Sequence, residues 1–407
     1  MTHLCSCVDR THSAVGPISG EFQQQPQNRP KSMSTDQLSR SLPTIVCHPA
    51  PADYRFETMI GRGFYDSAKV CVALHIPSST FLVVKRTDLD VQSTDQLETL
   101  KHEVQMLRSL HHPNILPLYS TFIINQELWT IFPLMSYGSC ADILSESYRD
   151  GMPEALIAAI LKEVLQGLDY LHRMSIIHRG MKGGHVLVGN DGRVCLSGLR
   201  KSFRLDPNSS GSKKAHDFPL HAVDLLPWMA PEILKQDLLG YDCSADIYSI
   251  GILAIELAHG SLPYVGLPPT KVLLEKLHKA SPSLCPTRSD ASDTSTMHTT
   301  TTGTDTGSVI TSLEAPASNV GQKKFSLVFH QFVDACVQND PSLRPTSNSL
   351  ACHSFIKQMK KKSPEILAEL LTGVPRLTHR QEESGVLGDM DVMETDLAAM
   401  SLDEWQF

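Results

Sequence analysis

The feature that most constrains the fold is a long helical segment that leads through a short loop into a β-hairpin. Apolar residues recur near the α-helical period of 3.6 along residues 153–174, at Leu156, Ile160, Val164, Leu168 and Leu171. The chain then reaches His178, and two strand-like runs, 186–188 and 194–196, flank Asn190-Asp191-Gly192. An Asp-Gly pair between such runs is a strong signal for a tight turn. The sequence therefore predicts a buried helix, a loop at His178 and a hairpin in direct succession.

Other motifs stand in a fixed order on both sides of this segment. They are Ile60-Gly61-Arg62-Gly63-Phe64, Val83-Val84-Lys85, Glu103, His178-Arg179-Gly180-Met181-Lys182, Pro227-Trp228-Met229-Ala230-Pro231-Glu232, Asp246-Ile247-Tyr248-Ser249-Ile250-Gly251 and Asp340-Pro341-Ser342-Leu343-Arg344-Pro345. Each motif alone has a false-positive risk. Together, in this order and at ordinary spacing, they resemble the motifs of the protein kinases. That resemblance implies that Arg344 pairs with Glu232.

The resemblance implies an α+β fold, namely the bilobal protein-kinase fold with a β-rich small lobe and a helical large lobe. We expect a kinase-like domain at 54–356, with Phe132 at the gatekeeper position of the nucleotide pocket. Within it, residues 281–323 form a low-complexity insert rich in Ser and Thr, which we expect to be a mobile loop. Residues 1–53 are rich in Ser, Pro and Gln and are predicted to be a disordered tail. Residues 357–407 form a C-terminal tail that includes a helical stretch.

The catalytic loop lacks the groups that move a phosphoryl group in kinases. Gly180 stands where kinases have the Asp that accepts the substrate hydroxyl proton. His185 and Gly198 stand at the two positions that hold Mg²⁺ in kinases, those of the catalytic-loop Asn and of the Asp in Asp-Phe-Gly. A neutral imidazole is a poor ligand for Mg²⁺, which prefers oxygen. We therefore expect no catalytic residues and no metal; a weakly active serine/threonine kinase of unusual mechanism is the alternative.

Nucleotide binding is a separate question, because much of the nucleotide pocket remains. The glycine-rich loop is degenerate, with Asp66 at its third glycine position, and an ion pair of Lys85 with Glu103 is expected from the kinase pattern. Arg200 and His185 could face the phosphates in place of metal. We expect ATP to bind without Mg²⁺; an empty pocket with Arg200 in solvent is the other interpretation. The candidate binding residues are Ile60, Gly61, Arg62, Gly63, Phe64, Ala68, Val70, Lys85, Glu103, His185 and Arg200.

The sequence also resembles one family of inactive kinases, the sterile-20-related adaptor (STRAD) pseudokinases. The resemblance rests on Ile60–Phe64, His178-Arg179-Gly180, Ser197-Gly198-Leu199, Ser244–Ile252 and the end Glu404-Trp405-Gln406-Phe407, and the opening Met1–Cys7 is similar to the beta form. Two residues depart from the family pattern. The family usually has Ser where this chain has Gly180, and Glu where it has Gln406. Neither departure restores a catalytic group.

The STRAD resemblance implies partners that composition and spacing do not reveal. It implies that the kinase-like domain binds and allosterically activates serine/threonine kinase 11 (liver kinase B), and helps to retain that kinase in the cytoplasm. It also implies that Trp405 and Phe407 bind the scaffold calcium-binding protein 39. Aromatic side chains on a polar, acidic tail are typical binding anchors; the other interpretation is that Trp405 folds back on the large lobe. The family location is cytoplasmic and nuclear.

Composition excludes several classes of partner. The 407-residue chain has a net charge of -8, which argues against nucleic acid as a main partner. Its ten cysteines are scattered without metal-type pairing and indicate reduced thiols in an intracellular protein. No apolar run approaches the roughly 20 residues that span a bilayer. We therefore expect no nucleic-acid, membrane or metal site.

Overall fold

The computed structural model describes residues 45–63, 67–205, 214–218, 223–284 and 324–379. Several predicted features lie outside these residues. They are the predicted tail up to residue 44, Phe64 of the glycine-rich loop, residues 285–323 of the predicted insert 281–323, and Trp405 and Phe407. No helix among the described residues is long and apolar enough to cross a membrane.

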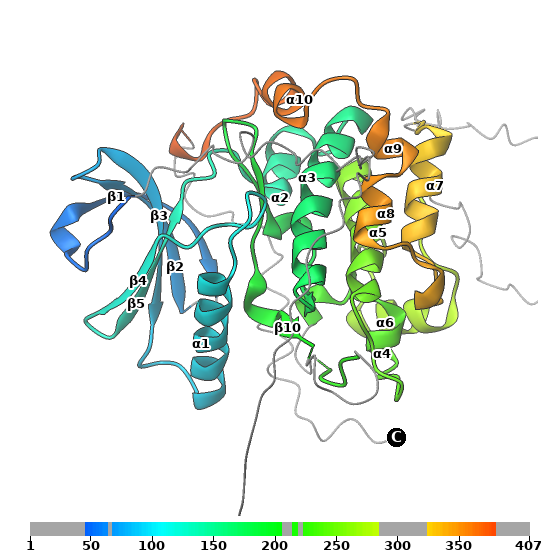
Figure 1. Cartoon of the computed structure of the whole chain (residues 1–407), viewed down its shortest axis with the longest axis horizontal. Helices are drawn as coiled ribbons and strands as arrows, with labels where there is room; N and C mark the ends of the chain where they lie inside the picture. Colours follow the sequence, from blue (N-terminus) through cyan, green and yellow to red (C-terminus); the bar gives the residue numbers. More distant parts are fainter. Residues whose placement is uncertain (1–44, 64–66, 206–213, 219–222, 285–323, 380–407) are drawn as a thin grey trace, which may run out of the picture. The chain divides into compact units, whose positions relative to one another are not determined.

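The small lobe is a five-stranded antiparallel sheet with one helix beside it (Figure 1). The strand order is β1-β2-β3-β5-β4, with bounds β1 Tyr54–Gly63, β2 Ala68–His75, β3 Thr80–Asp88, β4 Ser120–Ile124 and β5 Glu127–Pro133. Helix α1, Thr94–Ser109, begins at a capping box in which Ser93 and Gln96 exchange hydrogen bonds. The helix turns Glu103 toward the sheet and contacts the 3₁₀ turn η4, Leu199–Lys201, of the large lobe.

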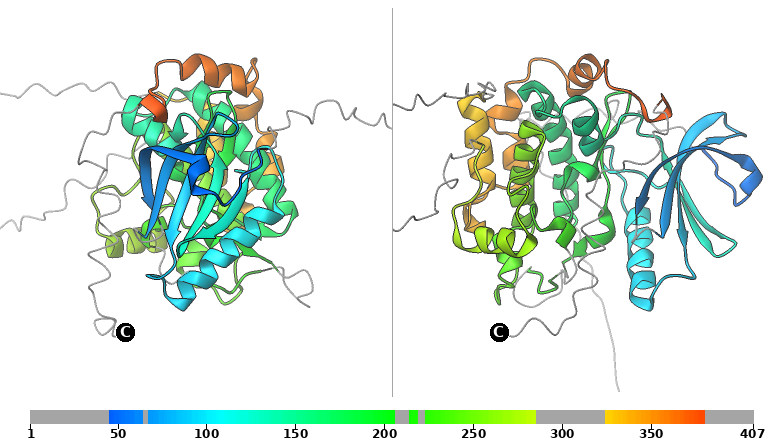
Figure 2. Two further views of the ribbon diagram at one scale, coloured as in Figure 1. Left: turned by 90° about the vertical axis from the view of Figure 1, so that its left-hand side faces the viewer. Right: turned by 180° about the vertical axis from the view of Figure 1, so that it is seen from behind.

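The large lobe is helical (Figure 2), and its core is built around α3, Glu154–Arg173, and α5, Ser244–His259. The predicted helix and hairpin are confirmed: α3 runs over Glu154–Arg173, and β8 and β9 occupy Val186–Val188 and Val194–Leu196. The other elements are β6 Gly138–Ser139, α2 Cys140–Ser147, β7 Ile176–Ile177, η3 Gly183–His185, β10 Phe203–Arg204, η5 Val223–Leu225, α4 Pro231–Leu234, α5 Ser244–His259, α6 Pro269–His278, α7 Leu327–Cys336, η6 Pro341–Leu343, α8 Ser347–Ala351 and α9 Ser354–Lys357.

Helix α3 has fully buried apolar residues on most of its surface, and it contacts α5, α8, α9 and β9. Helix α5 is buried along almost its whole length and ends at Gly260, whose φ of +72° suits glycine. The hairpin β8–β9 is tied to the segment after α1, because the backbone groups of Leu196 and of residues 114 and 116 exchange hydrogen bonds of 2.8 Å. The core thus fixes the loop between β7 and β8, where the predicted catalytic positions lie.

Two ends of the folded region extend beyond the predicted domain limits. Residues 45–53, predicted as part of a disordered tail, include the turn η2 (Pro51–Asp53), and Ile45 and Cys47 contact the aromatic cluster around Tyr54 and Trp129. The Tyr54 hydroxyl also donates to the carbonyl of His48 at 3.1 Å. Residues 357–379, predicted as tail, include α10 (Ser363–Leu370) and η7 (Leu377–His379). Helix α10 contacts α3, and Leu367 of the helix and Leu371 just after it are buried.

Candidate functional site

A buried carboxylate holds the loop that follows β7. Asp246, at the start of α5, is 1% exposed and accepts the backbone N–H of His178 at 2.8 Å and that of Arg179 at 2.9 Å. The His172 ring also lies 2.9 Å from this carboxylate. Burial raises the pKa of Asp246, but the His172 and His178 contacts outweigh it, so the pKa lies below its usual value. The ionised carboxylate therefore fixes the backbone just before Gly180.

The His178 ring links this loop to the end of β9. The Gly180 N–H donates to His178 Nδ1 at 3.1 Å, so the proton of the neutral ring is on Nε2, which donates to the Ser197 carbonyl at 2.9 Å. Burial lowers the pKa of His178, and the neutral ring is the form that accepts from Gly180. This single side chain therefore connects residues 180 and 197.

His185 fills the space between Gly180 and Gly198. Its Nδ1 lies 2.6 Å from the Gly180 carbonyl. A Cβ added to Gly198, whose φ is +77°, would lie 2.4 Å from that same Nδ1 and 2.5 Å from Cγ. A Cβ added to Gly180 would be 3.4 Å from the His185 Nδ1 and from the Gly198 carbonyl. Residues 180, 185 and 198 therefore lie in contact with one another. They are the positions that the kinase pattern assigns to the base and the metal ligands, and the His185 imidazole lies between the two glycines.

This arrangement does not fit a magnesium site. Burial, and then the neighbouring Lys182, hold the pKa of His185 well below its usual value, so the ring is neutral. Its Nδ1 carries the proton toward the Gly180 carbonyl, and Gly198 supplies no side-chain oxygen. Magnesium prefers an octahedral set of oxygens. The expectation that His185 faces the phosphates stays a prediction, and the neutral ring would meet them without a positive charge.

The candidate nucleotide-binding positions of the small lobe come together on β1, β2 and β3. Gly61 is opposite Val70, and Gly63 is opposite Ala68, in the β1–β2 ladder that also carries Ile60 and Arg62. Lys85 on β3 is opposite Val70, and its Nζ lies 3.1 Å from Glu103 Oε2 and 3.3 Å from Oε1. Both side chains of this pair are less than one-fifth exposed. Phe132 is 8% exposed near the end of β5, and half-buried Arg200 lies on η4 beside Gly198.

Arg179 makes contacts that the sequence gave no reason to expect. Its Nη1 lies 2.8 Å from Asp217 Oδ2 and 2.9 Å from the Tyr241 hydroxyl. Its Nε donates to the Lys201 carbonyl at 2.5 Å, and its guanidinium lies 5.1 Å from the centre of the Phe203 ring. Asp217 therefore lies beside the catalytic loop, but its carboxylate is engaged by Arg179. These contacts fix the described residues between Arg200 and Glu232, which correspond to the activation segment of kinases, against the loop.

A second buried acid, Glu256 on α5, lies beneath the loop. Its Oε2 accepts the Trp228 ring N–H at 2.9 Å and the Gly183 N–H at 3.1 Å. Burial raises the pKa of Glu256 to about 7, although these bonds and Lys182 partly oppose the shift. Glu256 is thus ionised or protonated according to pH near neutrality.

Replacing Glu256 with Gln is expected to reduce the pH dependence of stability. The folded pKa lies above the ordinary value of 4.5, so the protonated acid stabilises the fold at low pH and this contribution is lost as pH rises through about 7. The full loss is on the order of 3 kcal/mol. Gln has a carbonyl oxygen that can still accept both N–H groups and does not ionise. We expect the variant to be more stable than wild type at pH 8 and similar at pH 5, measured by urea denaturation.

The matched control for this prediction is Glu98→Gln, at an exposed position. If the free energy of unfolding depended on pH in the same way in wild type and in Glu256→Gln, this assignment would be contradicted.

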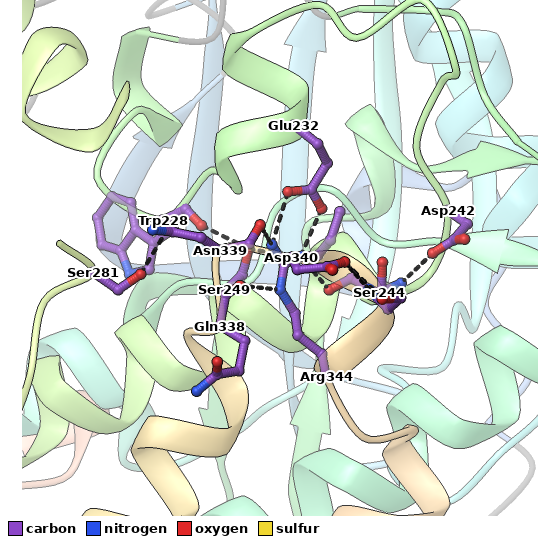
Figure 3. A network of polar contacts seen from close by, with 12 residues as sticks. Trp228, Glu232, Asp242, Ser244, Ser249, Ser281, Gln338, Asn339, Asp340 and Arg344 are labelled. Atoms are coloured by element: carbon purple, nitrogen blue, oxygen red, sulfur yellow. Dashed lines mark hydrogen bonds and ion pairs between the residues drawn. The ribbon is translucent and has the colours of Figure 1, made fainter. Parts of the chain in front are cut away.

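The end of the activation segment is fixed by a buried ion pair (Figure 3). Arg344 Nη1 and Nη2 lie 2.6 and 2.8 Å from the two oxygens of Glu232, as expected from the sequence. The Arg344 side chain is fully buried and also donates to the carbonyls of Gln338, Ser244 and Asn339. Ser249 on α5 donates to the Trp228 carbonyl at 2.8 Å. Residues 228–232 therefore have a fixed position on α5.

Comparisons with known proteins agree with this geometry. Residues 54–356 match the protein kinase domain family, which confirms the predicted kinase fold. The STE20-related kinase adapter protein alpha of Homo sapiens is 36% identical over 406 residues, covering 95% of this chain and 93% of that protein. The Bos taurus alpha protein is 38% identical over 372 residues, covering 88% and 99% respectively. The beta protein of Mus musculus is 35% identical over 381 residues, covering 90% and 91%. These identities do not separate the alpha and beta forms, and the predicted likeness to beta stays a prediction. The chain belongs to the STE20-related kinase adapter protein family.

Proposed function

We propose that this chain is a catalytically inactive adaptor that binds another protein kinase and favours that kinase's active conformation. The relatives are named kinase adapter proteins, which supports an adaptor role in general. The observation that carries the proposal is that Gly180, His185 and Gly198 stand at the base and metal-ligand positions of the kinase pattern and lie against one another. Losing a general base alone typically costs about 10²–10⁴-fold in rate.

The surviving contacts support a role in binding. The Lys85–Glu103 pair holds α1 toward the sheet, and the Arg179 and Arg344 contacts fix the described parts of the activation segment. A surface fixed in this way can select one conformation of a partner. By linkage, an adaptor that binds the active conformation more tightly shifts the partner toward it. The family resemblance suggests that this partner is liver kinase B and that the kinase-like domain of the adaptor binds it. It also suggests that the adaptor retains part of that kinase in the cytoplasm. The adaptor itself is proposed to be present in both cytoplasm and nucleus.

The C-terminal residues support a second proposed contact. Trp405 and Phe407 lie outside the described residues, and their aromatic character at the end of an acidic segment suits them as anchors on a partner. The resemblance suggests calcium-binding protein 39 as this scaffold. Trp405→Ala with Phe407→Ala is expected to abolish scaffold binding while leaving the kinase-like domain folded.

The adaptor proposal is tested by co-purification followed by a turnover assay of the partner kinase. We expect the three proteins to form one complex and the partner's turnover to rise in it. If the turnover of the partner kinase is unchanged at saturating concentrations of the adaptor, the chain only tethers its partners and does not activate them. The competing proposal, a weakly active kinase, is favoured by the intact Lys85–Glu103 pair, and a phosphoryl-transfer assay of the isolated chain separates the two.

We also propose that ATP binds without Mg²⁺, with Lys85 contacting the phosphates and Arg200 nearby. ATP at about 100 times its dissociation constant, in EDTA, is expected to stabilise the chain by about 2.7 kcal/mol. Lys85→Met should remove this effect because it deletes the ammonium, whereas Lys69→Met should not, since Lys69 is exposed on the neighbouring strand. The measurement is a thermal shift. No stabilisation of the wild type in EDTA would contradict ATP binding.

A further inference from the structure

An open groove lies on the large lobe, where the N-terminal turn of α3 meets the α9–α10 loop and α10. Its volume is about 430 Å³. Its apolar lining includes Ala155, Ala158, Met359, Ile366 and Leu370. Met359 and Leu370 are only partly buried against the core. The groove is therefore an apolar surface of the size that a few side chains of a helix can fill.

The rim of the groove is rich in lysine. Lys360 and Lys361 line it, and the exposed Lys357 and Lys362 are their neighbours in sequence. The acidic lining residues already have partners: Glu154 accepts the Ser326 N–H at 2.9 Å, and Glu369 pairs with Lys361 at 2.6 Å. Within the described ranges Lys360 forms no ion pair. Among the residues that the structure describes, Lys357 and Lys362 also form no ion pair, so three of the four lysines can pair with an acidic ligand.

The chain's own sequence contains a segment of matching character. Met390, Met393, Leu397 and Met400 are spaced by three, four and three residues, which is the apolar pattern of one helix face. Residues 388–407 contain six acidic residues and no Lys or Arg. Methionine side chains adapt well to irregular apolar grooves. The segment thus offers both an apolar face and the complementary charge.

We propose that residues 389–402 of the same chain bind in this groove as an amphipathic helix. Residue 380 follows η7 directly, and the nine residues 380–388 can extend up to about 30 Å. Binding within one chain benefits from an effective concentration in the millimolar range. Residues 405–407 lie beyond the segment and stay available for a scaffold. This proposal does not depend on the proposed adaptor function.

The test is hydrogen exchange of residues 356–371 in the full chain. The double variant Met393→Asp, Leu397→Asp is expected to raise exchange there at least about fivefold, because it places charge on the apolar face. Thr395→Asp adds charge off that face and serves as the matched control. Lys360→Glu should also raise exchange, whereas Lys235→Glu, at an exposed position outside the groove, should not.

A fluorescent peptide of residues 386–402 tests the same contact in trans. The peptide should bind the double variant more tightly than the wild type, because the substituted segment of the double variant no longer competes for the groove. Its binding should weaken as the salt concentration rises. Unchanged exchange in the double variant, or no peptide binding, would overturn the proposal. Protection that disappears on dilution would also overturn it, by indicating a second copy as the occupant. Scaffold binding measured on the same variants separates this outcome from a failure of the proposed adaptor function.

Discussion

Replacing Arg344 with Met is expected to lower the free energy of unfolding by about 3–5 kcal/mol. The substitution leaves the Glu232 carboxylate, 5% exposed, without its bidentate partner. Removing one partner of a buried ion pair strands the other charge, and this usually costs 3–5 kcal/mol. Three carbonyls that now accept from Arg344 also lose their donor (Figure 3). Urea denaturation followed by tryptophan fluorescence measures the loss.

The matched control is a surface pair of the same chemistry. Arg55 Nε lies 2.8 Å from Glu57 Oε1, and these side chains are 65% and 38% exposed. Arg55→Met should therefore cost at most about 1 kcal/mol. Replacing Glu232 with Leu together with Arg344→Met should recover most of the loss, because no charge is then stranded. Equal losses in Arg344→Met and Arg55→Met would show that burial of the pair is unimportant.

Replacing Gly198 with Asp is expected to destabilise the protein by about 2–5 kcal/mol rather than to restore a metal ligand. The new Cβ would lie within 2.6 Å of three atoms of the His185 ring, and the backbone has a positive φ of +77°. Overpacking typically costs 1–3 kcal/mol, and the left-handed conformation adds 1–2 kcal/mol for an L-residue. Thermal and urea denaturation measure the effect. Gly373→Asp is the control, since a Cβ there meets no atom within 4 Å.

The cause of this loss can be isolated with a second substitution. His185→Asn removes the ring, so the double variant Gly198→Asp, His185→Asn should be more stable than Gly198→Asp alone. Two contacting residues are expected to be non-additive by 0.5–3 kcal/mol. Additive effects of the two substitutions would contradict the view that His185 occupies the space needed at position 198.

Local patterns predicted much of the fold. The apolar period of residues 153–174 predicted α3 to within one residue at each end, because a helix that buries one face and leaves polar residues on the other shows its period clearly. The Asn190-Asp191-Gly192 turn predicted the bounds of β8 and β9. The Glu232–Arg344 pair was implied by the kinase resemblance and not by a local pattern.

Contacts that depend on tertiary packing were not predictable from local patterns. No pattern places the His185 ring against Gly198, because the clash of an added Cβ is a property of the folded loop. Nothing in the sequence indicates that Asp217 contacts Arg179. Residues 45–53 are polar and proline-containing, yet Ile45 and Cys47 find an aromatic surface that only the folded sheet provides. The sequence thus showed which residues stand at the catalytic positions, but not how these residues contact one another.

The most direct test of the account is a radiolabelled phosphoryl-transfer assay of the isolated chain with Mg²⁺–ATP and a general protein substrate. Lys85→Met supplies the background, and Lys69→Met controls for loss of a lysine from the small-lobe sheet. The account predicts that wild-type incorporation equals that of Lys85→Met. Metal-dependent turnover by the wild type and by Lys69→Met, absent in Lys85→Met, would contradict it and identify the chain as a kinase.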